Sequence, residues 1–355
     1  MRILIMANNI DELGGAQRVV HQLAAGLAGR GHEVTAVGVV PHAAPHGYPY
    51  GGYARTRLLD RPYPKGDRSA LERDATDRLQ VILDDGEPGV VITAQLWAME
   101  HLARCRVDAW RVIGQFHSSY EAAAAGRDLA RAKRVYRDVD AFALLTDADA
   151  QGFASHGFQN TVVMPNALPF LPPRPAPLDA EVITYLGRLS PEKGPRFLIE
   201  AWRLIAARHP AWRLQFIGSG PLADEIGRAA AADDLRMTVQ PPTADPMGAL
   251  LGSGLLALPS LTEGFPLTLA EAMACGVPVV ASDCSAGVRA LVEDGVDGLL
   301  ARRGDAEHLA AQLERVIADP ALRRALGAAG REKVADLDEP RILDRWERLL
   351  ADVCR

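Results

Sequence analysis

Two basic and two acidic side chains in the second half of the chain have the types and spacing of an anion- and hydroxyl-binding site. Arg188 and Lys193 lie within residues 187–194, and Glu263 and Glu271 lie within residues 259–280. A guanidinium offers a planar fork to phosphate oxygens, an ammonium group offers a mobile point charge, and carboxylates accept hydrogen bonds from hydroxyls. Together they predict a site for a sugar joined to a diphosphate. The alternatives are two solvated cations beside a turn and a glutamate that only stabilises a helix N-terminus.

The two acidic residues are expected on either side of a helix start. An apolar strand, a polar loop, a helix and a second strand follow one another in residues 255–280. Pro266 fits the first helical turn because its missing N–H group costs nothing there. Glu263 is therefore expected in the loop and Glu271 on the helix. The backbone N–H groups of Leu267 and Thr268 then point into the same site.

Adjacent glycines, Gly14 and Gly15, lie between a predicted strand at 3–7 and a predicted helix at 16–28. Glycines let the backbone approach a ligand closely, and the helix start behind them presents free N–H groups to an anion. The spacing is not Gly-x-Gly-x-x-Gly, so a dinucleotide fingerprint is absent. A plain tight turn is the alternative.

Both halves of the chain repeat a strand–helix–strand rhythm, which predicts parallel sheets covered by helices. The predicted strands are 3–7, 34–40, 90–93, 112–116, 141–145, 161–164, 182–186, 214–217, 255–258 and 277–280, with helices at 16–28, 197–208 and after Asp305. Residues 42–65 are predicted to be a loop, whose tyrosines either line an acceptor site or pack on the turn. Six prolines within residues 165–177 predict a stiff linker between two domains. The fold class is therefore α/β, with two doubly wound domains on either side of a cleft.

The composition narrows the kind of protein. A length of 355 residues favours two domains. With 45 acidic and 39 basic residues, the net charge of −6 excludes a general affinity for nucleic acid or anionic lipid. No apolar run reaches the roughly 18 residues that span a bilayer. The cysteines are too far apart for a zinc site or a disulfide framework, which favours reduced thiols in a cytoplasmic protein: Cys105, Cys275, Cys284 and Cys354.

These segments together resemble the retaining glycosyltransferases of the GT4 type (glycosyl transferases group 1), which have the GT-B fold with two Rossmann-like domains. The resemblance covers the Gly-Gly loop, His117, the turn at 165–166, and residues 187–194, 216–221, 263–271 and 294–300. It implies an N-terminal acceptor-binding domain of residues 1–168, with a C-terminal helix at 340–355 packing back on it. Residues 169–339 would then form the nucleotide-sugar-binding domain.

The resemblance also assigns roles on the donor side. Arg188 and Lys193 would bind the donor diphosphate, Glu271 would hold the ribose hydroxyls, and Glu263 would lie beside the donor sugar. The backbone groups expected to approach the phosphates and the sugar belong to Gly15, Leu267 and Thr268. The residues expected at the reaction centre are His117, Glu263, Arg188 and Lys193.

Three other positions complete the resemblance. His117 ends a strand and would contact a hydroxyl of the donor sugar. Gly14 and Asn166 are expected on the acceptor side, although Asn166 serves equally well to stabilise the linker turn. Residues 285–292 lack the Gly-Gly-x-x-Glu form that is common in the family, and Arg289 lies where an acidic residue is common.

The function implied by the resemblance is metal-independent transfer of a hexose, with retention, from a nucleotide sugar to a hydroxyl acceptor. UDP-glucose and UDP-N-acetylglucosamine are the expected donors, ahead of GDP-mannose. The acceptor would be a cell-wall polymer, a lipid-linked glycan or a natural product. No cofactor or nucleic-acid partner is expected, and peripheral contact with the inner face of a membrane stays open. The alternatives are a GT-B epimerase or phosphorylase, or a binding protein without catalysis. The Ala- and Arg-rich composition is typical of a GC-rich bacterial genome.

Overall fold

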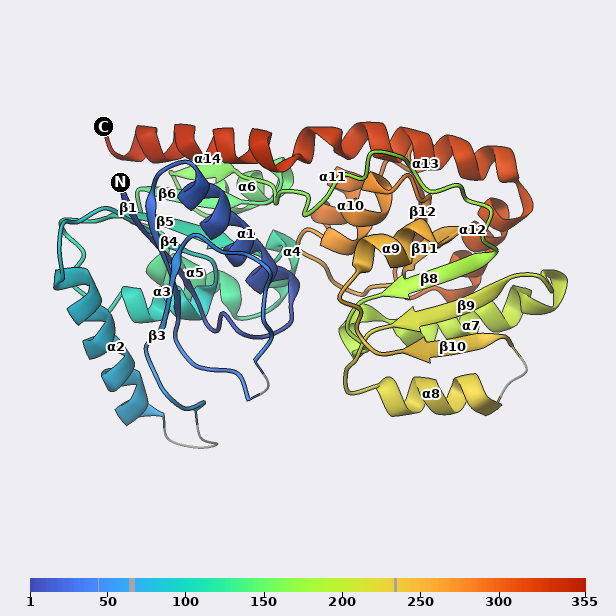
Figure 1. Ribbon diagram of the computed structural model, residues 1–355, viewed down its shortest axis with the longest axis horizontal. Coiled ribbons are helices and arrows are strands. Elements are labelled where there is room, and N and C mark those ends of the chain that lie inside the picture. The colour runs from blue at the N-terminus through green and yellow to red at the C-terminus, as the bar shows by residue number, and fades with distance from the viewer. Residues whose placement is uncertain (44, 64–67, 233–234) are drawn as a thin grey trace. The chain divides into compact units, whose positions relative to one another are not determined.

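The computed structural model describes residues 1–43, 45–63, 68–232 and 235–355. The chain divides into two compact units (Figure 1). Unit 1 consists of Met1–Ala167 and Glu339–Arg355, and unit 2 consists of Leu168–Asp338. Each unit contains one sheet in which all paired strands are parallel, seven strands in unit 1 and six in unit 2. The predicted α/β class with two doubly wound sheets is confirmed.

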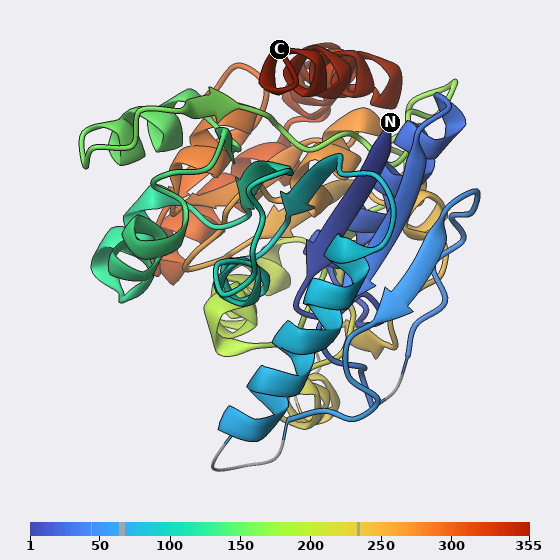
Figure 2. The same cartoon turned by 90° about the vertical axis from the view of Figure 1, so that its left-hand side faces the viewer.

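The sheet of unit 1 has the strand order β3-β2-β1-β4-β5-β6-β7 (Figure 2). Its strands are β1 (Arg2–Ala7), β2 (Glu33–Gly38), β3 (Ala54–Arg57), β4 (Val90–Thr93), β5 (Arg111–Phe116), β6 (Ala141–Leu144) and β7 (Thr161–Val163). The chain builds outward in one direction from β1 to β3 and then in the other direction from β4. Loops at the carboxyl ends of β1 and β4 therefore flank a switch point, where open parallel sheets bind ligands.

Helices of unit 1 cover the sheet and bury its continuous apolar strands. They are α1 (Gly15–Gly29), α2 (Ser69–Asp84), α3 (Leu96–Leu102), α4 (Tyr120–Ala125), α5 (Asp128–Val135), α6 (Asp147–Ala154) and α14 (Glu339–Val353). The C-terminal helix α14 packs on α1, where Leu343 lies so close to Gly26 that a Cβ there would overlap it. Trp346 of α14 is 2% exposed, so burial of this apolar face holds the end of the chain in unit 1.

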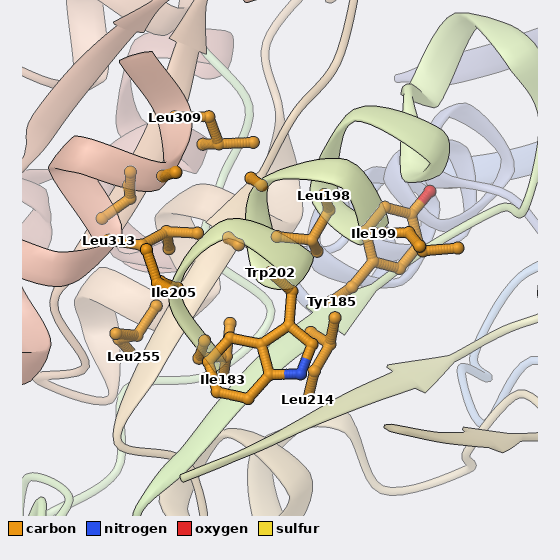
Figure 3. Packing of buried hydrophobic residues seen from close by; sticks show 14 of the residues in the cluster. Ile183, Tyr185, Leu198, Ile199, Trp202, Ile205, Leu214, Leu255, Leu309 and Leu313 are labelled. Carbon is orange, nitrogen blue, oxygen red and sulfur yellow. The ribbon is translucent and has the colours of Figure 1, made fainter. Parts of the chain in front are cut away.

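The sheet of unit 2 has the order β10-β9-β8-β11-β12-β13, the same winding as in unit 1. Its strands are β8 (Val182–Leu186), β9 (Arg213–Ile217), β10 (Met237–Gln240), β11 (Leu255–Leu258), β12 (Val279–Asp283) and β13 (Leu299–Arg302). Its helices are α7 (Pro195–Ile205), α8 (Ala223–Ala232), α9 (Pro246–Leu251), α10 (Leu267–Ala274), α11 (Ala286–Leu291), α12 (Ala306–Ala318) and α13 (Pro320–Val334). Trp202 of α7 is fully buried in the core between α7 and the sheet (Figure 3), and its Nε1 donates to the Leu235 carbonyl at 2.6 Å.

Several local predictions were wrong. Strand β3 lies inside the segment 42–65 that was predicted to be a loop; residues 44, 64 and 65 of that segment lie outside the described residues. This edge strand reads Ala-Arg-Thr-Arg, so no apolar alternation announces it. Strands β10 and β13 were not predicted, and β12 begins two residues later than expected, after Pro278. Pro266 is the N-cap residue of α10 rather than part of its first turn.

The proline-rich segment 165–177 has neither helix nor strand, and from Leu168 on it belongs to unit 2. The Ala176 N–H donates to the Cys275 carbonyl at 2.7 Å, and Arg331 donates to the Pro172 carbonyl at 2.5 Å. All four cysteines are free thiols. Within the described part of the chain, no helix combines the length and the apolar character needed to cross a bilayer.

Candidate functional site

Two loops meet at the switch point of the unit 2 sheet. Residues 187–194 follow β8 and residues 259–266 follow its neighbour β11, so both loops leave the same edge of the sheet. The Leu261 N–H donates to the Glu192 carbonyl at 2.8 Å. Gly194 has a left-handed φ of 64°, and a Cβ at this position would overlap the Pro259 carbonyl oxygen. The glycine that ends the first loop therefore allows the second loop to pack directly on it.

An ion pair joins the two loops. Lys193 Nζ lies 2.8 Å from both Oε1 and Oε2 of Glu263, and the Ser260 hydroxyl donates to Oε1 at 2.7 Å. The Glu263 side chain is 7% exposed and the Lys193 side chain is 32% exposed. An ammonium group has three N–H donors and a carboxylate has about four acceptor positions. Each partner therefore keeps capacity for a ligand, an N–H on Lys193 and a lone pair on Glu263 Oε2.

Arg188 adds a second cation to this edge of the sheet. Its backbone carbonyl accepts a hydrogen bond from the Tyr185 hydroxyl at 2.6 Å, while its side chain is exposed. Arg188 forms no ion pair with any residue in the part of the chain that the structure describes. Gly218 packs against the Gly187 carbonyl so closely that a Cβ would overlap it. The backbone of the Arg188 loop is therefore supported, and its guanidinium is left open to an anion.

The N-terminus of α10 is the third part of this site. The N–H groups of Leu269 and Ala270 bond to the Pro266 carbonyl, so those of Leu267 and Thr268 precede the helical ladder and have no acceptor within it. Such N–H groups and the helix dipole favour an anion. Glu271, one turn further along α10, is only 1% exposed. A ligand reaches its carboxylate only if the atoms that cover it move.

Helix α11 packs against the loop that contains Glu263. Gly287 lies against the Gly264 carbonyl oxygen so closely that a Cβ would overlap it. Ser285 caps α11, with its Oγ accepting from the Val288 N–H at 3.4 Å. Arg289, the basic residue in place of a common acidic one, pairs with Asp283 at 2.7 Å. Although residues 285–292 lack the common Gly-Gly-x-x-Glu form, helix α11 still packs against the Glu263 loop.

The segment 294–300 has a structural role in unit 2. Asp297 accepts from the Glu293 N–H and from Lys333 Nζ, both at 2.7 Å, and Asp294 accepts from the Leu300 N–H at 2.8 Å. These bonds fix a turn that leads into β13. The Asp297 and Lys333 side chains are 5% and 32% exposed, almost the same values as for the Glu263–Lys193 pair.

Unit 1 places the Gly-Gly loop at its own switch point, after β1. Asn8 links the neighbouring strand ends: its N–H donates to Gln95 Oε1 at 2.8 Å, and its Oδ1 accepts from the Ala98 N–H at 2.9 Å. Gly14 is the N-cap residue of α1 in an extended conformation, and Gly15 is the exposed first residue of the helix. The two glycines therefore lie at a helix N-terminus, as expected from the sequence.

His117 follows β5 directly, two strands away from β1 in the sheet. The residue as a whole is partly exposed, but its Nε2 atom is buried and has no hydrogen-bond partner among the described residues. Burial lowers the pKa of His117 from 6.5 to about 4. The imidazole is therefore neutral at pH 7, and Nε2 has an unused capacity for one hydrogen bond.

Asn166 is 5% exposed, and its Oδ1 is buried without a partner among the described residues. It lines a cavity of about 20 Å³ together with Gln115 and residues of α1 and α14. This volume accommodates one water molecule. The Oδ1 atom therefore accepts no hydrogen bond from the described residues of the linker turn.

Acid should destabilise the protein because His117 is held neutral. Between pH 6.5 and about 4 the unfolded chain binds a proton at this residue and the folded chain does not. The free energy of unfolding should therefore fall as the pH decreases through this range, by at most about 3 kcal/mol. Urea unfolding at several pH values would measure the slope, and His117→Gln should reduce it. An equal slope in the wild type and the variant would contradict the assignment. Burial also lowers the pKa of His21 and of His101, so part of the slope should remain.

In unit 2 the structure brings Lys193 and Glu263 into direct contact, next to the start of α10. Two supporting residues, Ser260 and Gly287, were not predicted, although they lie within residues 259–280 and 285–292. A hydroxyl three residues before a loop glutamate is a signal that could have found Ser260. No local pattern indicates Gly287, because its neighbour Gly264 is distant in the sequence.

The two units match two family models. Residues 13–169 match Glycosyltransferase Family 4, and residues 171–333 match Glycosyl transferases group 1. A glycosyltransferase of Haemophilus influenzae is 28% identical over 96% of this chain and 98% of its own length. The D-inositol 3-phosphate glycosyltransferase of Mycobacterium avium is 37% identical, but over 41% of this chain and 35% of its own length.

Solved structures share the fold. Sucrose-phosphate synthase of Thermosynechococcus elongatus superimposes with a TM-score of 0.82 at 20% identity, over 99% of each chain. Anabaena HepE in complex with UDP-glucose gives a TM-score of 0.81 at 19% identity, over 99% of this chain and 100% of its own. With one family model matched by each unit and a relative of the same kind over the full length, the chain belongs to the GT4-type glycosyltransferases, which have the GT-B fold.

Proposed function

We propose that the protein transfers a hexose from a UDP-sugar to a hydroxyl acceptor, with retention at the anomeric carbon and without a metal ion. The observation that carries the proposal is the contact of Lys193 with Glu263 at the switch point of unit 2, next to Arg188 and the start of α10. Structures of HepE with UDP-glucose and of Staphylococcus aureus TarM with UDP support UDP as the nucleotide. UDP-glucose and UDP-N-acetylglucosamine are the first donors to test.

Charge stabilisation would be the main contribution of the protein. As the anomeric bond breaks, negative charge grows on the leaving diphosphate. Lys193 is already held by Glu263 and the first N–H groups of α10 belong to a fixed helix, while the exposed Arg188 side chain is available at the same edge of the sheet. Little reorganisation would therefore be needed in the transition state. The third N–H of Lys193 is free to bind a phosphate oxygen while the other two stay on Glu263.

The sugar would be held by neutral and anionic acceptors. Glu263 of unit 2 has one unused acceptor position on Oε2, which suits a sugar hydroxyl. In unit 1, the neutral His117 has an unbonded Nε2, which also suits a hydroxyl. In the retaining reaction that we propose, the acceptor oxygen attacks the anomeric carbon from the side that UDP leaves. The leaving phosphate takes the acceptor proton, so no side chain is required as the base.

Transfer should continue in EDTA, because two cations and a helix N-terminus supply the positive charge that a metal would otherwise bring. The expected result is that kcat in excess EDTA stays within about twofold of the value with Mg²⁺. The measurement is UDP release coupled to product formation. Full loss of transfer that added Mg²⁺ restores would overturn the metal-independent proposal.

The proposed function is tested by incubating the full chain with nucleotide sugars and an acceptor panel, followed by NMR of the product. An α-linked product from an α-linked donor would support retention. Donor turnover without acceptor modification would favour an epimerase, and release of a sugar phosphate would favour a phosphorylase. Tight donor binding without turnover would favour a binding protein.

A further inference from the structure

The loop before α1 is held by a segment that returns from the edge of the unit 1 sheet. Within the loop, Asn9 Oδ1 accepts the N–H groups of Asp11 and Glu12, both at 2.8 Å. From the returning segment, the His46 N–H donates to the Asp11 carbonyl at 2.7 Å. Residues 9–12 are therefore fixed before the glycines are reached.

Tyr48 fixes the glycines themselves. Its hydroxyl accepts the Gly14 N–H at 2.9 Å, and it lies 2.8 Å from the Glu12 carbonyl and 3.0 Å from the Gly14 carbonyl. The single hydroxyl proton is donated to one of these two oxygens, so the hydroxyl is both an acceptor and a donor of hydrogen bonds. Burial raises the pKa of Tyr48, which keeps the phenol protonated and able to donate. Among the described residues 41–43 and 45–50, Tyr48 is the one buried side chain.

Two more contacts from the same region strengthen this arrangement. His21 Nε2 lies 2.6 Å from the Ile10 carbonyl, which can only accept, so Nε2 carries the proton and Nδ1 accepts from the Tyr53 hydroxyl at 2.5 Å. The centroids of the His21 and Tyr48 rings lie 4.6 Å apart. Arg57 of β3 holds Asp11 with two bonds of 2.6 and 2.9 Å.

These contacts bear on the two roles that the sequence left open for Tyr48 and Tyr53. The hydroxyls of Tyr48 and Tyr53 are both bonded within unit 1, to the glycine loop and to His21. Packing on the turn is therefore favoured over lining an acceptor site.

Adjacent glycines allow close approach to a ligand, but they also lose the most conformational freedom when they are ordered. Gly14 and Gly15 have no side chains that could hold them, and Leu13 beside them is 52% exposed and offers no buried anchor. A loop with adjacent glycines orients its backbone N–H groups precisely only if other residues fix its backbone. The one side chain that bonds directly to the Gly14 N–H is Tyr48, among the residues that the structure describes.

We propose that Tyr48 is a positioning residue for the transfer reaction: its hydroxyl fixes the backbone of residues 12–14, so that the N–H groups at the start of α1 are held in one conformation. Tyr48 acts through the glycine loop and does not itself touch the substrate. The proposal rests on the proposed function for its effect on rate, but not for its effect on the loop.

The test is Tyr48→Phe in the full chain, which removes the hydroxyl and keeps the ring against His21. Amide hydrogen exchange at residues 12–16 should become about 10-fold faster, because the Gly14 N–H loses its acceptor. The value of kcat with a UDP-sugar should fall by about 10-fold, with a smaller change in KM, because the loop then occupies its reactive conformation for a smaller fraction of the time.

The matched control is Tyr63→Phe, which removes the hydroxyl of another unit 1 tyrosine, one that bonds to His101 Nε2 at 3.2 Å and not to the glycine loop. Both variants should lose similar thermal stability, but only Tyr48→Phe should change exchange in the loop and kcat. Equal kcat values in the two variants, or wild-type exchange in Tyr48→Phe, would overturn the positioning role. Faster exchange in a protein whose wild type transfers no sugar would instead overturn the proposed function and leave the structural role of Tyr48 intact.

Discussion

Replacing Lys193 by alanine is expected to lower kcat for sugar transfer by about 10² to 10³, the effect of removing one preorganised group from a developing anion. Lys193 is held 2.8 Å from both oxygens of Glu263, so it is ordered before any donor arrives. The substitution also leaves Glu263, whose side chain is 7% exposed, with Ser260 alone as a partner. A loss of stability on the order of 2 kcal/mol is therefore expected as well.

A control with the same stability cost separates these two effects. The pair of Lys333 and Asp297 has nearly the same exposure and an N–O distance of 2.7 Å, and it supports the turn before β13. Lys333→Ala should therefore lower the unfolding free energy by an amount similar to that of Lys193→Ala, while kcat measured well below the melting temperature stays near the wild-type value. If the two variants lose activity equally, Lys193 contributes only to folding and its assignment to the diphosphate is wrong.

Replacing Glu271 by alanine is expected to weaken binding of a UDP-sugar by about 10²-fold, because charged hydrogen bonds to two ribose hydroxyls contribute roughly 1.5–3 kcal/mol each before losses on binding. The effect should appear in the Kd measured by calorimetry and not mainly in kcat. Because Glu271 is 1% exposed, formation of this contact requires a local opening around α10. Donor binding should therefore be accompanied by a change in amide exchange along this helix.

The ligand itself provides the control for Glu271. UDP that lacks both ribose hydroxyls should bind the wild type about 10²-fold more weakly than UDP, and Glu271→Ala should reduce that preference to within about threefold. If Glu271→Ala weakens UDP and the dideoxy analogue equally, the residue stabilises α10 and does not recognise the ribose.

The sequence by itself determined the fold class, because continuous apolar runs alternating with amphipathic segments allow little else than parallel sheets covered by helices. It also predicted where the candidate residues lie relative to the strands and helices. Residues 187–194 and 259–266 do follow strands, and Glu271 does lie on α10. These features depend on neighbours along the chain, where Gly194 ends one loop and Pro266 precedes one helix.

The sequence could not predict β3, since an edge strand of alternating polar residues carries no apolar signal. That strand matters because Arg57 at its end holds Asp11 in the glycine loop. A strand defined mainly by the pairing of its backbone becomes visible only when its partner, β2, is in place.

Only the tertiary structure decided which of the candidate residues are in contact. Lys193 and Glu263 are 70 positions apart, and they meet because β8 and β11 are neighbours in the sheet. Tyr48 and Gly14 are 34 positions apart, and the return of the chain from the sheet edge joins them. The physical reason is the same in both cases. The sequence specifies which groups can bond. The winding of a parallel sheet specifies which loops share an edge and therefore which groups come within hydrogen-bonding distance.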